Sequence, residues 1–323
     1  MRKIIKSIIV SSLLLTGAMA KDSNTTVKKE ALVIPTTDIQ IFTSENRDEK
    51  ITPKSIEEAF TKAGFFISAN RNMNKPFIKQ FKESKFQIYN LFTFYKQDVV
   101  LELAKKYPNV GLFAPMSMSI YSKKGSNTIS ISMLSSKAMA KIMKIQDDDK
   151  ILRDLKKLII KTVETAMPKG KFDKLSYTLQ KPKGELVTNF SMEMDKDEWE
   201  DELEDFKMGL EGDFATNGFI IAGQNNLGDD FEEADYNGYD FYEVYSICKL
   251  PVIYTIAKTH PEAGAFAPCS LYLEKKKGQD NMNIAFPSVY NWMSSMALDN
   301  KEDIKVLEDA QNRMTKILKG ATE

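Results

Sequence analysis

Histidine and cysteine are nearly absent from this chain of 323 residues, which has one histidine, His260, and two cysteines, Cys248 and Cys269. This scarcity excludes the repeated Cys and His spacings of zinc sites and of haem attachment motifs. No Gly-x-Ser-x-Gly segment presents a serine to His260. A Walker loop and a Gly-x-Gly-x-x-Gly fingerprint are missing too. The sequence therefore contains no established catalytic motif and implies no cofactor.

An excess of charge of one sign is also absent, because 45 Lys and Arg residues balance 45 Asp and Glu residues. Nucleic-acid binding needs clustered Lys and Arg side chains that displace counterions from phosphates. Here lysines alternate with acidic residues along most of the chain. We therefore expect no nucleic-acid partner.

The N-terminal residues 1–20 have the pattern of a secretory signal peptide. A positively charged start is followed by an apolar stretch from Ile4 to Leu15 and by small residues that end in Ala18-Met19-Ala20. The apolar stretch is shorter than the roughly 20 residues that span a bilayer. We expect export across the inner membrane to the periplasm, with no membrane span after cleavage; an uncleaved anchor is the alternative.

The rest of the chain repeats itself. Residues 111–117, Gly-Leu-Phe-Ala-Pro-Met-Ser, return as residues 264–270, Gly-Ala-Phe-Ala-Pro-Cys-Ser. The Lys-Lys-Gly turn at Gly125 returns at Gly278 with the same spacing. Self-similarity of this kind indicates two tandem copies of one domain. We expect residues 21–36 to form an N-terminal segment, 37–167 the first copy, 168–185 a linker and 186–323 the second copy, with the two copies pairing within the chain.

Each copy begins with an alternating strand, followed by a helix that ends near a glycine, Gly64 or Gly218. In the first copy Thr52-Pro53 gives the cap and first-turn proline of that helix. Antiparallel strands and amphipathic helices follow, and the polar stretches 70–85 and 223–238 are expected to be surface loops. The order strand, helix, antiparallel strands, helix predicts an α+β fold.

Several of the repeated residues resemble a known family. Gly218-Phe219 after a helix, a strand ending in Cys248, the His260-Pro261 step and Ala267-Pro268-Cys269 are similar to the domain of unknown function 302 family. The resemblance covers both copies, and the first departs from it with Tyr95 and Met116 at the cysteine positions. It implies a TATA-box-binding-protein-like (helix-grip) arrangement, a curved antiparallel sheet around a long helix, and it implies no activity.

The two cysteines allow several roles. In an exported protein Cys248 and Cys269 could form a disulfide, or both could be buried and inert. Alternatively, Cys248 lies before Lys249 near an expected helix N-terminus, where the dipole and the lysine would lower its pKa and make a redox thiol. With His260 the two thiols are also the candidates for a metal site. His260 is otherwise a turn residue before Pro261.

A binding role is the function that we expect first. Tyr239, Tyr242 and Tyr245 fall on an aromatic strand that ends in Cys248. With the two cysteines they are the candidates for an apolar, aromatic-lined cleft that takes a small apolar ligand or a partner protein. The alternatives are a thiol-redox or metal-handling protein that uses Cys248 and Cys269, and a structural module for assembly.

Overall fold

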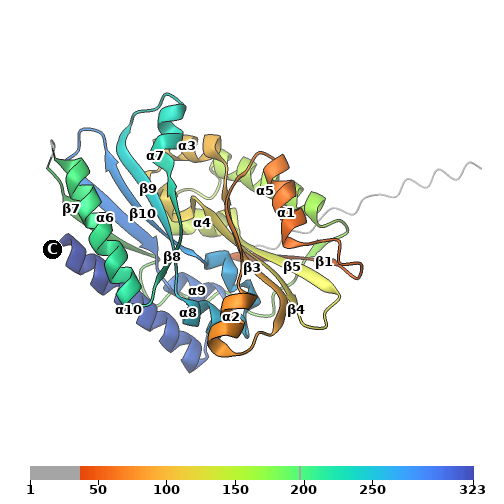
Figure 1. Ribbon diagram of the computed structural model, residues 1–323. Coiled ribbons are helices and arrows are strands. Elements are labelled where there is room, and N and C mark those ends of the chain that lie inside the picture. Colours follow the sequence, from red (N-terminus) through yellow and green to blue (C-terminus); the bar gives the residue numbers. More distant parts are fainter. Residues whose placement is uncertain (1–36, 196–197) are drawn as a thin grey trace, which may run out of the picture. The chain divides into compact units, whose positions relative to one another are not determined.

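The computed structural model describes residues 37–195 and 198–323, which form one α+β unit with two antiparallel sheets (Figure 1). The predicted signal peptide and N-terminal segment lie outside the described residues. The first sheet has the strand order β2-β3-β4-β5-β1-β6 and the second has the order β7-β11-β10-β9-β8. Read from the other edge, the second order is β8-β9-β10-β11-β7, which matches the first order without β6. Such a match is expected of a repeated unit. No helix among the described residues is long and apolar enough to cross a membrane.

The first copy supplies the first sheet and six helical segments. Its strands are β1 (Ile39–Glu45), β2 (Phe66–Asn72), β3 (Phe86–Tyr95), β4 (Met116–Lys123), β5 (Thr128–Leu134) and the short β6 (Lys171–Phe172). Its helices are α1 (Pro53–Lys62), α2 (Asn74–Phe81), α3 (Gln97–Lys106), the 3₁₀ segment η1 (Pro108–Phe113), α4 (Ser136–Met143) and α5 (Lys150–Ala166). The expected linker thus contains β6, which pairs with β1.

The second copy repeats this order. Its strands are β7 (Val187–Glu193), β8 (Ile220–Asn226), β9 (Tyr239–Cys248), β10 (Cys269–Lys276) and β11 (Asn281–Pro287). Its helices are α6 (Trp199–Thr216), α7 (Leu227–Glu233), α8 (Leu250–Ala257), the 3₁₀ segment η2 (Pro261–Phe266), α9 (Tyr290–Ser295) and α10 (Lys301–Thr322).

Local sequence signals explain where the first helices begin. Thr52 caps α1, accepting a hydrogen bond from the Ser55 N–H, and Pro53 occupies the first turn. Ser135 caps α4 in the same way through the Ala138 N–H. The prediction that the polar stretches 70–85 and 223–238 are surface loops was wrong. Each continues an edge strand and then forms a short helix, α2 or α7, because one phenylalanine in each helix is buried.

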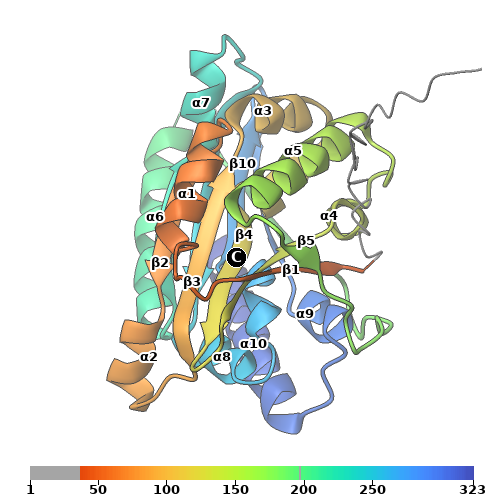
Figure 2. The same cartoon turned by 90° about the vertical axis from the view of Figure 1, so that its right-hand side faces the viewer.

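Helices cover the outer face of each sheet. Figure 2 shows α1 and α5 side by side over the first sheet, and Figure 1 shows α6 and α10 along the second. The inner faces contact the other copy: η2 lies against β4 and β5, and η1 lies against β10 and β11. The buried apolar residues therefore form clusters that draw on both copies.

A pair of pseudo-equivalent tyrosines holds these inner contacts. The Tyr89 hydroxyl donates to the Pro261 carbonyl at 3.1 Å, and the Tyr242 hydroxyl donates to the Pro108 carbonyl at 2.6 Å. The repeated Gly111 and Gly264 allow the close approach. A Cβ at Gly111 would lie 2.5 Å from the Tyr272 Cβ, and one at Gly264 would lie 2.4 Å from the Ser119 Cβ.

Candidate ligand cavity between the two copies

The two cysteines do not form a disulfide, and both thiols are free. Cys269 on β10 is directly paired with Ile247 on β9. Directly paired residues share a face of the sheet and successive residues alternate, so Cys248 points to the face opposite Cys269. The disulfide that the sequence allowed is therefore absent. The two cysteines lie at neighbouring strand ends, but the strand register directs their side chains to opposite faces of the sheet.

Desolvation keeps both thiols protonated at neutral pH. Burial raises the pKa of Cys248 to about 12, and burial raises that of Cys269 to about 12 as well. The prediction that the α8 N-terminus and Lys249 lower the Cys248 pKa was wrong. The Lys249 ammonium instead donates to the Asn217 carbonyl at 2.7 Å and lies 4.6 Å from the centre of the Phe219 ring.

The metal candidates are not brought together. His260 precedes η2, its ring 6.0 Å from the ring of Tyr177, and its Nδ1 is 3.0 Å from the Thr259 hydroxyl oxygen. Among the residues that the structure describes, no group of three or more His, Cys, Asp and Glu side chains could hold a metal ion. The donor set needed for a Cys-Cys-His site is not assembled here.

The three predicted tyrosines do not share one cleft. Tyr242 and Tyr245 are three positions apart on β9 and so point to opposite faces. The Tyr239 hydroxyl donates to the Ala104 carbonyl, and the Tyr242 hydroxyl contacts η1. On the outer face the Tyr245 hydroxyl lies 3.5 Å from a Glu211 carboxylate oxygen on α6. All three rings are buried, and they belong to the core and to the contact between copies.

A cavity of about 260 Å³ lies where the edge strands β2 and β8 approach each other. Both strands are irregular at the same place, with register shifts between Ile67 and Ala69 and between Ile221 and Gly223. Such bulges bend an edge strand and stop it from pairing with a neighbour. The two edges therefore do not join the sheets into one, and they leave space between them.

Two hydrogen bonds bridge the edges beside this cavity. The Ser68 hydroxyl donates to the Asn225 side-chain oxygen at 2.5 Å, and the Arg71 guanidinium donates to the Ala222 carbonyl at 3.0 Å. Ser68 and Ala222 are equivalent bulge residues of the two copies. The bridges fix the spacing of the strands, so the cavity is built into the fold.

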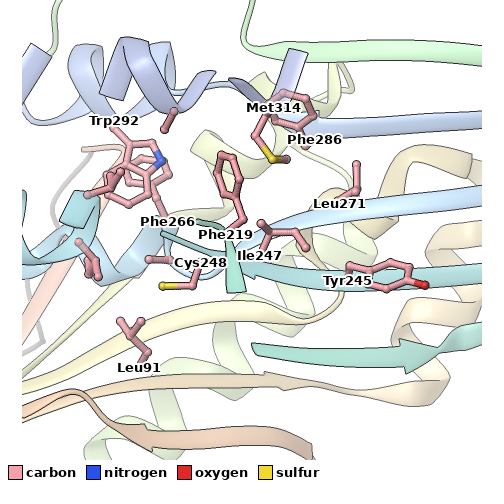
Figure 3. Close-up of a cluster of buried hydrophobic side chains, with 14 of the residues drawn as sticks. Leu91, Phe219, Tyr245, Ile247, Cys248, Phe266, Leu271, Phe286, Trp292 and Met314 are labelled. Atoms are coloured by element: carbon pink, nitrogen blue, oxygen red, sulfur yellow. The ribbon is translucent and has the colours of Figure 1, made fainter. Parts of the chain in front are cut away.

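The lining is mostly apolar. Cys248, Leu250 and Pro268 come from the second copy, and Leu91 lies opposite them. Figure 3 shows the Cys248 sulfur on the side of its strand that faces Leu91, with Phe219 and Phe286 on the other side. The remaining lining residues are Ser68, Ala69, Arg71, Asn72, Met73, Pro76, Thr93, Ile220, Ile221, Ala222, Gly223 and Ser246.

The first copy fills the pseudo-equivalent position with a tyrosine. Tyr95 occupies the place in the first copy that Cys248 has in the second, and Asp230 on α7 is the counterpart of Pro76 on α2. The Tyr95 hydroxyl reaches Asp230 and donates to its carboxylate at 2.8 Å. Gln97, the counterpart of Leu250, donates to the same carboxylate at 2.6 Å. The Tyr95 ring occupies the space at its own strand end. The smaller Cys248 side chain leaves the equivalent space open at the end of β9.

A second, smaller cavity of about 60 Å³ lies beneath α10 on the outer face of the second sheet. Cys269 lines it with Phe219, Trp292 and Met314, and Cys248 borders it from the strand end. The Cys269 thiol lies 3.4 Å from the Pro287 carbonyl, as expected of a weak hydrogen bond from a half-buried thiol. Cys269 is half-buried and packs against the core between sheet and helix.

The difference between the copies at Tyr95 and Cys248 was visible in the sequence, but the approach of the two edge strands that frame the cavity was not. Ser68, Arg71 and Ala222 fall in or beside the stretches read as loops. A paired signal was nevertheless present, because Ser68 and Ala222 occur at equivalent positions after Gly64 and Gly218. Only the three-dimensional structure shows that these equivalent edges meet.

The chain belongs to the DUF302 family, whose family model, described as a domain of unknown function, matches residues 42–166 and 198–321. No curated protein matches the chain. It is similar to the crystal structure of an uncharacterized conserved protein DUF302 from Bacillus stearothermophilus, with 14% sequence identity and a TM-score of 0.36. That match covers 43% of this chain and 100% of the other. The family carries no assigned activity, so the site has to be interpreted from its own chemistry.

Proposed function

We propose that the protein is a binding module that takes one small, mostly apolar ligand in the cavity between β2 and β8. The observation that carries the proposal is the exchange of Tyr95 for Cys248 between the two copies, which opens one of two pseudo-equivalent positions. A side chain large enough to fill this space occurs at the same place in the first copy. A ligand site requires such open space, whereas packing of the core alone gives no reason for it on one side only.

The size and lining support a small hydrophobic or aromatic ligand. The cavity of about 260 Å³ is larger than an engineered apolar cavity of about 150 Å³ that binds benzene. Leu91, Leu250 and Pro268 offer apolar surface, and the protonated Cys248 thiol is a small, weakly polar contact. Ser68 and Arg71 supply the few polar groups that orient a ligand in such pockets.

The alternative of a thiol-redox protein has weaker support, because a reactive thiol needs a low pKa and some exposure. Both thiols here have raised pKa values, and they lie on opposite faces of the sheet. Export to the periplasm, which residues 1–20 predict, belongs to our proposal as well. The TATA-box-binding-protein-like arrangement stays a prediction for each copy.

A titration with fluorobenzene, followed by fluorine NMR, tests the binding proposal. We expect saturable binding at one site per chain, since Tyr95 fills the pseudo-equivalent position. Absence of saturable binding contradicts a ligand cavity. Two equal sites per chain contradict the role given to the exchange of Tyr95 for Cys248.

A further inference from the structure

A separate cavity of about 450 Å³ lies on the inner face of the first sheet, where β4 and β5 meet η2 of the second copy. Residues 173–177, which follow β6, form a further wall. Its surface is rich in hydroxyl groups and differs in character from the apolar cavity between β2 and β8. Its hydroxyl-bearing residues are Thr43, Tyr121, Ser122, Ser126, Thr128, Ser130, Ser176, Tyr177 and Thr259.

The carboxylate of Glu262 is the most unusual group in this wall. Glu262 is only 5% exposed, and its Oε1 accepts a hydrogen bond from the Tyr177 hydroxyl at 3.0 Å. No Lys or Arg among the described residues forms a salt bridge with it, although buried carboxylates are normally paired. A carboxylate has about four acceptor positions, so one hydroxyl leaves most of its capacity for a ligand.

The backbone that carries Glu262 is fixed by the first copy. The Ser132 hydroxyl donates to the Glu262 carbonyl at 2.8 Å. The hydroxyl groups of Tyr89 and Ser119 both donate to the preceding Pro261 carbonyl. Three hydroxyl donors from one sheet thus fix the backbone that carries the carboxylate, and the Tyr177 hydroxyl bonds the carboxylate itself, so less ordering is needed when a ligand binds.

The buried part of the wall is anionic and aromatic. Burial, and then the nearby Glu262 carboxylate, raise the pKa values of Tyr121 and Tyr177, so both phenols stay neutral. Asp173 adds a second carboxylate, which accepts from the Thr43 hydroxyl at 2.7 Å. The lysines of the lining, Lys123 and Lys174, are exposed, and their ammonium groups remain solvated. His260 is the other basic side chain of the lining and is half-buried.

We propose that this cavity binds a small organic ammonium ion. Its N–H groups donate to Glu262 and Asp173, and its carbon skeleton rests on the rings of Tyr121 and Tyr177. A carboxylate flanked by aromatic faces favours such a cation by charge, by hydrogen bonding and by cation–π attraction. This site is independent of the apolar cavity described above.

The pseudo-equivalent place, where η1 meets β10 and β11 of the second sheet, does not repeat this arrangement. The counterpart of Glu262 is Asn109, and the counterpart of Tyr121 is Glu274. Asn109 donates to the Met143 carbonyl, and Glu274 accepts from Asn283 in the second sheet. One ammonium site per chain is therefore expected, and Glu274 offers a matched buried carboxylate outside the cavity.

Calorimetric titration of the full chain with putrescine, butanediol and succinate tests the proposal. We expect one putrescine site, with no comparable binding of the diol or the diacid. Glu262→Gln keeps an acceptor for Tyr177 but removes the charge, so putrescine affinity should fall at least tenfold, whereas Glu274→Gln should leave it unchanged. Equal binding of the diol, or wild-type affinity of a folded Glu262→Gln variant, would overturn the proposal.

A rim substitution keeps the test decisive if Glu262→Gln fails to fold. Ser176 is exposed and lines the cavity. Ser176→Trp should block putrescine binding while the circular dichroism spectrum and the fluorobenzene titration stay those of the wild type. Unchanged putrescine binding in the Ser176→Trp variant would place the ammonium ion elsewhere and contradict the proposal.

Discussion

The Tyr95 hydroxyl of the first copy donates a hydrogen bond of 2.8 Å to the Asp230 carboxylate of the second. The ring spans the space that stays open beside Cys248 at the pseudo-equivalent position. One pair of residues therefore joins the two copies and makes them unequal. The asymmetry arises from the size of one side chain, because the strands and bulges around it are repeated.

Removing the Tyr95 hydroxyl should weaken the contact between the copies without opening a cavity. A hydrogen bond to a charged acceptor contributes about 1.5–3 kcal/mol, so Tyr95→Phe should lower the free energy of unfolding by about 1–2 kcal/mol. Tyr95→Cys also empties the space and should cost about 3–5 kcal/mol. Urea denaturation measures both. Equal stability of the two variants would show that the ring fills no buried space.

The equivalent tyrosines Tyr89 and Tyr242 should respond unequally to loss of their hydroxyl groups. The Tyr242 hydroxyl donates to Pro108 and accepts from the Gly111 N–H at 2.7 Å, so Tyr242→Phe leaves two buried groups unpaired. In the other copy Pro261 keeps the Ser119 donor when Tyr89 is lost. We expect Tyr242→Phe to cost about 2–4 kcal/mol and Tyr89→Phe about 1 kcal/mol. The reverse order in thermal or urea unfolding would contradict these contacts.

Gly111 and Gly264 should tolerate no side chain, because each packs against the sheet of the other copy. A Cβ at Gly111 or Gly264 would come within 2.5 Å of the opposite sheet. We expect Gly264→Ala to destabilise the protein through overpacking by about 1–3 kcal/mol. Gly212 on the exposed face of α6 has no atom within 4 Å of such a Cβ, so Gly212→Ala is the control. Gly212→Ala should stabilise the helix by about 0.5–1 kcal/mol. A lower free energy of unfolding in Gly212→Ala would contradict the exposed position of Gly212.

Stability should fall at alkaline pH because the fold keeps Cys248 protonated. Burial raises its folded pKa to about 12, whereas an unfolded thiol ionises near pH 8.5. Between these values the native state binds more protons than the unfolded state, so the free energy of unfolding decreases as pH rises, by up to about 1.4 kcal/mol per pH unit for this group. Cys248→Ala should flatten the decline between about pH 9 and pH 11. An unchanged slope in urea titrations would contradict a buried thiol.

Most of the order of elements could be predicted from the sequence because its signals are local, but the short helices α2 and α7 were missed. Thr52 and Ser135 are helix caps that act within three residues, and alternation identified the hairpin strands. The contacts between copies could not be predicted, because they depend on backbone approaches such as Gly111 against Tyr272. The predicted tyrosine cleft was wrong because Tyr242 and Tyr245, three positions apart on a regular part of β9, face opposite ways. A register shift next to Tyr239 puts its ring on the same side as Tyr242.

For Cys248, the sequence predicted the place of a candidate site correctly and the reactivity of the thiol wrongly. The difference between Tyr95 and Cys248 directed attention to one strand end, and the apolar cavity lies there. Reactivity was inferred from Lys249 and a helix N-terminus, but burial outweighs both in setting the thiol pKa. Sequence shows which residues are near one another along a strand, whereas desolvation depends on what covers them.

Fluorobenzene binding to the Cys248→Tyr variant, compared with the wild type and with Cys269→Ser as the matched control, decides whether the small side chain at position 248 opens a ligand site. Fluorine NMR should show one saturable site in the wild type and in Cys269→Ser, and no saturable binding in Cys248→Tyr, because the new ring occupies the cavity as Tyr95 does in the first copy. Circular dichroism establishes that each variant is folded. Wild-type binding by a folded Cys248→Tyr variant would contradict a ligand site beside Cys248.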